Sequence, residues 1–308
     1  MKNLKAMTVL ILLMTIITVH MHIDAKAQDV PSNNSAKYEK LISSDFVRLI
    51  AEEDARRRQK QSLPENEETQ LKKARIKELL NMKALFFTDG ALRIDLSKIS
   101  DKELHTYAES LEPHLPVWNT ALLLGTLIYD SETMSFYTPE LDERFIANLI
   151  LNNKLTAILK NTSDKGLHFS ALNNTKSNCY CYYTKLNATG IATQNYNTIS
   201  NYYISMSQLP GADAWASTVG YWISFVQEGG AWDYKAHWGG ITICFTIQGI
   251  YGYHYNPEWL GNYNYGFTGK FLFPLDILHA GSYAISGFQQ SDIVTDWPAI
   301  DLGYSHAP

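Results

Sequence analysis

Apolar residues at helical spacing dominate the first part of the sequence. Those within residues 46–51 would share one face of a helix that Ser44 can cap. A second amphipathic helix is predicted from about residue 65 to residue 86. The Ser-Leu-Pro triplet at 62–64 separates the two helices, because proline does not continue a helix.

Three further features extend this helical pattern. Residues 100–103, Ser-Asp-Lys-Glu, form a capping-box sequence that predicts the start of a third helix, which Pro113 interrupts. The apolar run at 121–129 is too short to span a bilayer and is interpreted as buried core. Thr138-Pro139 predicts a capped helix with proline at its first position. Residues 28–160 are therefore expected to form a helical domain.

The second half of the chain alternates in character. Residues 161–204 are rich in Asn, Thr, Ser and Tyr and favour short strands or a long ordered loop. Helical spacing returns at 214–226, and Gly229-Gly230 ends that element. Residues 241–255 are β-branched and aromatic and predict a β-hairpin, whereas 267–288 predict two short helices.

These elements predict a helix-rich α+β fold with three parts. A helical N-terminal domain would cover residues 28–160, and a connecting segment would cover 161–204. Residues 205–308 would form a mixed module with a small β-hairpin or sheet.

The N-terminus predicts export. Lys2 and Lys5 precede an apolar run from Met7 to Val19, and Ala25-Lys26-Ala27 has the small-x-small pattern of a signal-peptidase site. We therefore expect residues 1–27 to be a signal peptide and the protein to be secreted or periplasmic. The alternative is an uncleaved N-terminal anchor.

The chain has three cysteines, Cys179, Cys181 and Cys244. An oxidising compartment permits a disulfide, and one of the first two joined to Cys244 is the natural pairing. Three thiols without a disulfide are an equal alternative. No zinc-binding spacing accompanies these cysteines.

Three polar-aromatic blocks follow one another in the last quarter of the chain. Residues 229–235 read Gly-Gly-Ala-Trp-Asp-Tyr-Lys, residues 261–269 read Gly-Asn-Tyr-Asn-Tyr-Gly-Phe-Thr-Gly, and the tail at 292–303 contains Asp, Asp, Ile and Gly at regular spacing. Their order resembles the bacterial toxin 44 (polymorphic toxin type 44) domain family over about residues 205–308. The tail departs from that pattern at Ile293 and Val294. The resemblance implies an exported antibacterial or interaction toxin with an immunity protein as partner, and such domains are often presumed to be nucleases.

Charge argues against a nucleic-acid substrate. The whole chain has a formal net charge of −5. Residues 200–308 hold Lys235, Lys270 and no arginine against eight carboxylates, and they contain six of the seven tryptophans. Binding of nucleic acid depends on lysine and arginine, so this composition suits a neutral polymer such as glycan better than a polyanion. Tryptophans that simply pack in the core are the alternative explanation.

The candidate catalytic residues are charged or titratable: Asp233, Lys235, His237, Asp292 and Asp296. In an extended segment the first two would point the same way and could form an ion pair, and the histidine has a pKa near neutrality. The last two would share one face of a helix, where one carboxyl could be an acid and the other stay ionised. In a loop they could instead hold a divalent metal ion, and the sequence suggests no other cofactor. A solvated acidic turn and an incidental histidine are the alternatives.

The candidate substrate-binding residues are aromatic or amide side chains: Trp232, Tyr234, Asn262, Asn264 and Tyr265. The glycines around the last three would let a ligand approach the backbone closely. A structural turn capped by asparagine side chains is the alternative.

Together these observations predict a toxin-like hydrolase that acts outside the cytosol, with cell-wall glycan favoured over RNA as its substrate. Two alternatives stay open. One is a non-catalytic secreted protein that binds carbohydrate or another surface, and the other is the nuclease presumed for the family.

Overall fold

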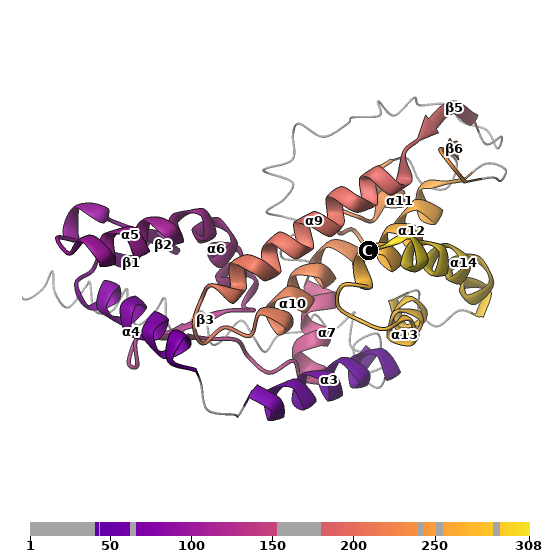
Figure 1. The fold of residues 1–308 in the computed structure, drawn as a ribbon. Coiled ribbons are helices and arrows are strands. Elements are labelled where there is room, and N and C mark those ends of the chain that lie inside the picture. The colour runs from indigo at the N-terminus through magenta and orange to yellow at the C-terminus, as the bar shows by residue number, and fades with distance from the viewer. Residues whose placement is uncertain are drawn as a thin grey trace, which may run out of the picture. The chain divides into compact units, whose positions relative to one another are not determined.

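Helices form most of the described chain, and short strands pair between them (Figure 1). The computed structural model describes residues 41–42, 44–61, 66–152, 180–238, 243–250, 255–285 and 290–308. The predicted signal peptide and Cys179 lie outside these ranges.

The α-helices are α3 Asp45–Gln61, α4 Glu67–Asn81, α5 Lys102–Leu111, α6 Leu115–Leu124, α7 Glu143–Asn152, α9 Ala188–Ser207, α10 Ala214–Val226, α11 Tyr234–His237, α12 Pro257–Gly269, α13 Leu275–Ile285 and α14 Gln290–His306. The strands are β1 Leu85–Thr88, β2 Ala91–Ile94, β3 Ile128–Asp130, β4 Ser135–Tyr137, β5 Tyr180–Leu186 and β6 Ile243–Ile247, and the 3-10 turns are η2 Leu96–Lys98 and η3 Glu112–His114. The described residues therefore have the predicted helix-rich α+β fold.

The first predicted helix is present, and the second is shorter than predicted. Ser44 caps α3, because its hydroxyl accepts the backbone N–H of Val47 at 3.4 Å. α4 ends at Asn81, and the predicted last turn of that helix is replaced by the antiparallel pair β1–β2. Asp89 and Gly90 make the tight turn between these strands with φ values of 51° and 76°. Asp89-Gly90 between two apolar runs is a sequence signal for a hairpin, and the predicted helix over 65–86 did not take it into account.

Two helices begin at caps other than those predicted. α5 is capped by Asp101, whose carboxylate accepts a backbone N–H at 2.8 Å, and not by Ser100. α7 begins after Asp142, whose carboxylate accepts a backbone N–H at 2.7 Å. Thr138 is instead a tertiary contact, because its hydroxyl accepts the backbone N–H of Asp213 at 2.9 Å. Aspartate is the better acceptor for helix N–H groups in both places.

α9 corrects the expectation of strands or loop over 161–204. Strand β5 is present there, but 188–207 form one long helix, which Asn187 caps. Its buried side chains recur at helical spacing and are small, β-branched or aromatic: Ala188, Ala192, Ile199, Tyr202 and Met206. The low helix propensity of the many Asn, Thr and Ser residues in this stretch concealed the helical spacing of its buried residues. Packing against other helices can override such low propensity. α9 contacts α6, α10 and α12 (Figure 1).

The sheet formed by β5 and β6 is parallel. A hairpin over 241–255 was predicted, and Phe245 and Tyr255 do exchange two backbone hydrogen bonds of 2.8 and 2.9 Å. The main partner of β6 is nevertheless β5, which lies far away in the sequence. The register places Cys181 opposite Cys244. A disulfide between Cys244 and one of the two earlier cysteines remains a prediction. The register identifies Cys181 as the cysteine whose backbone lies opposite Cys244.

α12 replaces the turn considered for residues 261–266, and it begins the helical region ten residues before the predicted 267. It lies against α14, and two glycines bring the backbones together. A Cβ on Gly266 would lie 2.1 Å from the carbonyl oxygen of Ile300, and a Cβ on Gly303 would lie 2.0 Å from that of Tyr263. Gly266 of the second sequence block and Gly303 of the third therefore serve helix packing. α13 in turn contacts α3 and α14.

Candidate functional site

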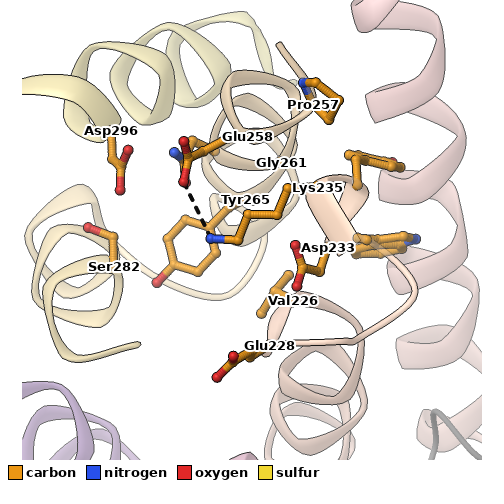
Figure 2. A pocket seen from close by; sticks show the side chains of 13 residues that line it. Val226, Glu228, Asp233, Lys235, Pro257, Glu258, Gly261, Tyr265, Ser282 and Asp296 are labelled. Carbon is orange, nitrogen blue, oxygen red and sulfur yellow. Dashed lines mark hydrogen bonds and ion pairs between the residues drawn. The ribbon is translucent and has the colours of Figure 1, made fainter. Parts of the chain in front are cut away.

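A cavity of about 260 Å³ opens where the three sequence blocks meet (Figure 2). Its lining residues come from the end of α10, the following loop, and helices α11, α12, α13 and α14. They are Val226, Glu228, Trp232, Asp233, Tyr234, Lys235, Pro257, Glu258, Gly261, Asn262, Tyr265, Ser282 and Asp296. Seven of the ten candidate residues predicted from the sequence therefore lie around one cavity.

The loop between α10 and α11 is held by its own backbone. Gly230 donates to the carbonyl of Gln227 at 2.8 Å, and Trp232 donates to that of Phe225 at 3.0 Å. The carboxylate of Asp233 accepts the N–H of Gly229 at 2.8 Å. The ring of Trp232 stacks on Phe225 with centroids 4.5 Å apart. These bonds fix the position of the aspartate at the cavity wall.

The predicted ion pair between Asp233 and Lys235 does not form. The prediction assumed an extended segment, but Lys235 lies in the helical turn α11, where residues two apart point in different directions. Its ammonium instead lies 3.4 Å from a carboxylate oxygen of Glu258 on α12. Figure 2 shows the lysine side chain extending toward this carboxylate near the ring of Tyr265.

Tyr234 and Asn264 belong to a buried polar network beside the cavity. The amide nitrogen of Asn195 on α9 donates to the hydroxyl of Tyr234 and to the amide oxygen of Asn264, both at 2.8 Å. Burial raises the pKa of Tyr234, so its hydroxyl stays neutral at physiological pH. Asn264 is fully buried and does not line the cavity. Its predicted role as a ligand-binding amide is thus replaced by a contact between α9 and α12.

The remaining binding candidates line the cavity from α12. Asn262 is half-buried there. Tyr265 is buried, and its hydroxyl donates to the carbonyl oxygen of Leu278 at 3.1 Å. Burial raises the pKa of this tyrosine as well, which excludes it as an acid or base near neutral pH.

The tail supplies one carboxylate to the cavity. Asp292 and Asp296 both lie on helix α14, which is the first of the two arrangements expected for them, and not in a loop. Asp296 lines the cavity opposite Asp233, and Ser282 of α13 lies on the same side as Asp296 (Figure 2). The side chain of Asp292 lies outside what the structure describes. Ser282 accepts the indole N–H of Trp297 at 3.2 Å.

His237 does not face the cavity. It is exposed, and its ring nitrogen Nε2 donates to the carbonyl oxygen of Gly230 at 2.9 Å. This bond closes the loop that carries Asp233, so the contact made by His237 is structural. Among the described lining residues there is no histidine.

Core packing, the alternative explanation for the tryptophans of residues 200–308, accounts for three of the six. Trp215, Trp222 and Trp232 are at most 8% exposed. Trp238 and Trp259 are half-buried and keep part of their surface accessible. The aromatic composition of this region is therefore a weaker indication of glycan binding than the sequence suggested.

The electrostatics of the cavity are acidic. Among the described lining residues, four carboxylates stand against the one ammonium of Lys235; they belong to Glu228, Asp233, Glu258 and Asp296. Sequence reasoning missed the two glutamates as site residues. Asn256-Pro257 was the available signal for Glu258, because an asparagine cap followed by proline predicts a helix start with the glutamate in its first turn.

The guanidinium groups of Arg56, Arg57 and Arg58 are all paired with carboxylates within α3. Arg56 and Arg57 both bond the carboxylate of Glu53, and Arg58 bonds that of Asp54 at 2.8 Å. These guanidinium groups therefore offer little unpaired charge to a polyanion. The described residues contain no group of three or more His, Cys, Asp or Glu side chains placed to hold a metal ion.

Comparison with known proteins gives no relative from which to transfer a function. No family model matches the chain, and neither do curated proteins or solved structures. Among the described helices, none combines the length and apolar character that a membrane crossing requires.

Proposed function

We propose that this chain is a toxin-like hydrolase whose active site is the acidic cavity and whose substrate is cell-wall glycan. The observation that carries the proposal is the convergence of four carboxylates from the α10–α11 loop, α12 and α14 on one cavity of about 260 Å³. Hydrolysis of a glycosidic bond requires two carboxyl groups, one to protonate the leaving oxygen and one to assist attack. The cavity has the groups for both roles.

Asp233 is the first choice for the acid and Asp296 the second. They face the cavity from opposite sides (Figure 2). Asp233 is half-buried and stands in the chain between Trp232 and Tyr234, whose side chains are buried. The ammonium of Lys235 is directed to Glu258 and forms no direct ion pair with Asp233.

The acidic cavity supports a neutral or cationic substrate over RNA or DNA. A phosphate backbone would meet four carboxylates and one ammonium, and the resulting repulsion disfavours binding. Glycan carries hydroxyl and amide groups that carboxylates and Asn262 can bind by hydrogen bonds. The predicted signal peptide and the resemblance to bacterial toxin 44 support an extracytosolic target and an immunity partner.

Purified protein without its predicted leader should be incubated with peptidoglycan and, separately, with RNA. We expect soluble wall fragments with new reducing ends and intact RNA. New amino groups without reducing ends would identify peptide rather than glycan cleavage. Cleavage of RNA alone would overturn the proposal in favour of a nuclease. Retention on peptidoglycan without any hydrolysis would identify a binding protein, the alternative that the accessible surfaces of Trp238 and Trp259 favour.

A further inference from the structure

Glu258 occupies a defined place at the start of α12. Asn256 caps this helix, with its side-chain oxygen accepting the backbone N–H of Trp259 at 2.8 Å. Pro257 takes the first helical position, and Glu258 takes the second. The N-terminal turn of a helix has unpaired N–H groups and a positive potential, which stabilise a negative charge.

Lys235 adds a second positive neighbour from another element. Its ammonium lies 3.4 Å from one oxygen of Glu258. Both side chains are partly exposed, at 49% and 39%, so solvent weakens the pair. One carboxylate oxygen is engaged by the lysine, which holds the group at the cavity and leaves the second oxygen for another partner.

We propose that Glu258 is the general base of the hydrolytic site and that Lys235 positions it. This inference rests on the proposed hydrolase function. The free carboxylate oxygen takes a proton from a water molecule as the water oxygen forms a bond to the anomeric carbon. The bond from that carbon to the leaving oxygen breaks, and the acid on the cavity wall protonates the leaving oxygen. Transfer of protons to and from solvent then restores both carboxyl groups.

Glu258 fits this role better than Asp233 or Asp296. A general base must be held where it can reach the attacking water, and Glu258 is held at the cavity by the first turn of a helix and by an ammonium from another element. Asp233 has a backbone N–H of Gly229 as its neighbour and not the lysine. Asp296 lies well inside α14, beyond the first turn where the helix dipole acts.

The test compares Glu258→Gln, Glu258→Ala and an exposed control, Asp276→Asn, in the same peptidoglycan assay. Asp276 also lies in the first turn of a helix, α13, but does not line the cavity. We expect Glu258→Gln to lose about 10²–10⁴-fold in kcat/KM, the usual range for acid–base catalysis, and the control to keep wild-type activity. Added formate or azide should restore at least part of the activity of Glu258→Ala, because a small anion can occupy the space left by the carboxylate.

Lys235→Met supplies a second measurement that does not depend on the glutamate variants. Without the ammonium the carboxylate of Glu258 loses the contact that positions it, so kcat should fall while KM changes little, and Lys235→Arg should restore kcat. Wild-type hydrolysis with an unaffected Glu258→Gln would overturn the assignment while leaving the hydrolase function intact. An unchanged kcat in Lys235→Met would remove the lysine from the proposal. A wild type without hydrolysis would overturn both the function and the base.

Discussion

The backbones of Gly266 and Ile300 meet directly, since a Cβ at position 266 would lie 2.1 Å from the carbonyl oxygen of Ile300. This contact joins α12 to α14. α12 carries Glu258, Asn262 and Tyr265 into the cavity, and α14 carries Asp296. The width of the cavity between these two walls is therefore set by a glycine contact that does not itself line the cavity.

Replacing Gly266 with alanine should destabilise the protein. The added methyl group would overlap a backbone carbonyl, which cannot move aside as a flexible side chain can. We expect a loss of about 1–3 kcal/mol in the free energy of unfolding, as for other overpacked sites. Urea unfolding followed by circular dichroism measures it.

Gly261→Ala is the matched control on the same helix. A Cβ there would lie 3.7 Å from the carbonyl oxygen of Trp232, which is an ordinary contact. Alanine has the higher helix propensity, so this variant should be unchanged or more stable by up to about 1 kcal/mol. Equal destabilisation of both variants would show that the close approach of α12 and α14 is not the cause.

Asp233→Asn tests the first-choice acid. The amide keeps the size of the side chain and can still accept the N–H of Gly229, but it cannot donate an acidic proton to the leaving oxygen. We expect a loss of about 10²–10⁴-fold in the rate of wall hydrolysis with folding retained. Reducing-end release under single-turnover conditions measures the rate.

The same variant separates an enzyme from a binding protein. A binding protein should keep most of its affinity for peptidoglycan after Asp233→Asn, whereas truncation of the half-buried Trp238 should weaken it. Wild-type hydrolysis rates in Asp233→Asn would transfer the acid role to Asp296, the second choice. Sedimentation with insoluble peptidoglycan gives the affinity.

Periodicity predicted the helices whose buried faces are made of strongly apolar residues. α10 is the clearest case, because Val219 and Trp222 lie at helical spacing and are fully buried. α9 escaped prediction because its buried side chains, small ones such as Ala188 and aromatic ones such as Tyr202, stand among many Asn, Thr and Ser residues. Only its packing against α6, α10 and α12 makes that stretch helical, and such packing is not visible in a local pattern.

The sequence motifs indicated where the cavity residues lie but not how they pair. Asp233 and Lys235 are neighbours in the chain, yet the helical turn α11 turns the lysine toward Glu258, twenty-three residues further on. The glycines at 261–269 suggested a ligand-binding turn, whereas Gly266 and Gly269 are buried in a helix. A glycine permits close approach of any atoms, and the sequence does not tell a ligand from a neighbouring helix.

The parallel pairing of β5 and β6 predicts a disulfide between Cys181 and Cys244. The two positions are opposite one another in the register, and neighbouring strands lie about 4.8 Å apart, within the range of Cα separations that a disulfide spans. Cys244 is buried at 3% exposure. Peptide mapping without reduction should find these two cysteines linked and Cys179 as a free thiol. A link from Cys179 to Cys244 would contradict the register-based pairing.

The stability of the contact between η3 and α9 should depend on pH through His114. Its ring nitrogen Nδ1 lies 3.1 Å from the hydroxyl of Ser205, and its ring stacks against Trp118 with centroids 6.0 Å apart. Partial burial lowers the pKa of His114 below the value of about 6.5 that it has in an unfolded chain. Between these two pKa values the unfolded state binds more protons than the folded state.

Acidification from pH 7.5 to pH 5 should therefore lower the free energy of unfolding, because the unfolded pKa of His114 is passed before the folded one. His114→Gln removes the titrating group and keeps a side chain that can bond Ser205. The melting temperature of this variant should fall less than that of the wild type over the same pH range. The difference between the two curves isolates the histidine from all other titrating groups, and parallel curves would show that burial at η3 does not contribute to the pH dependence.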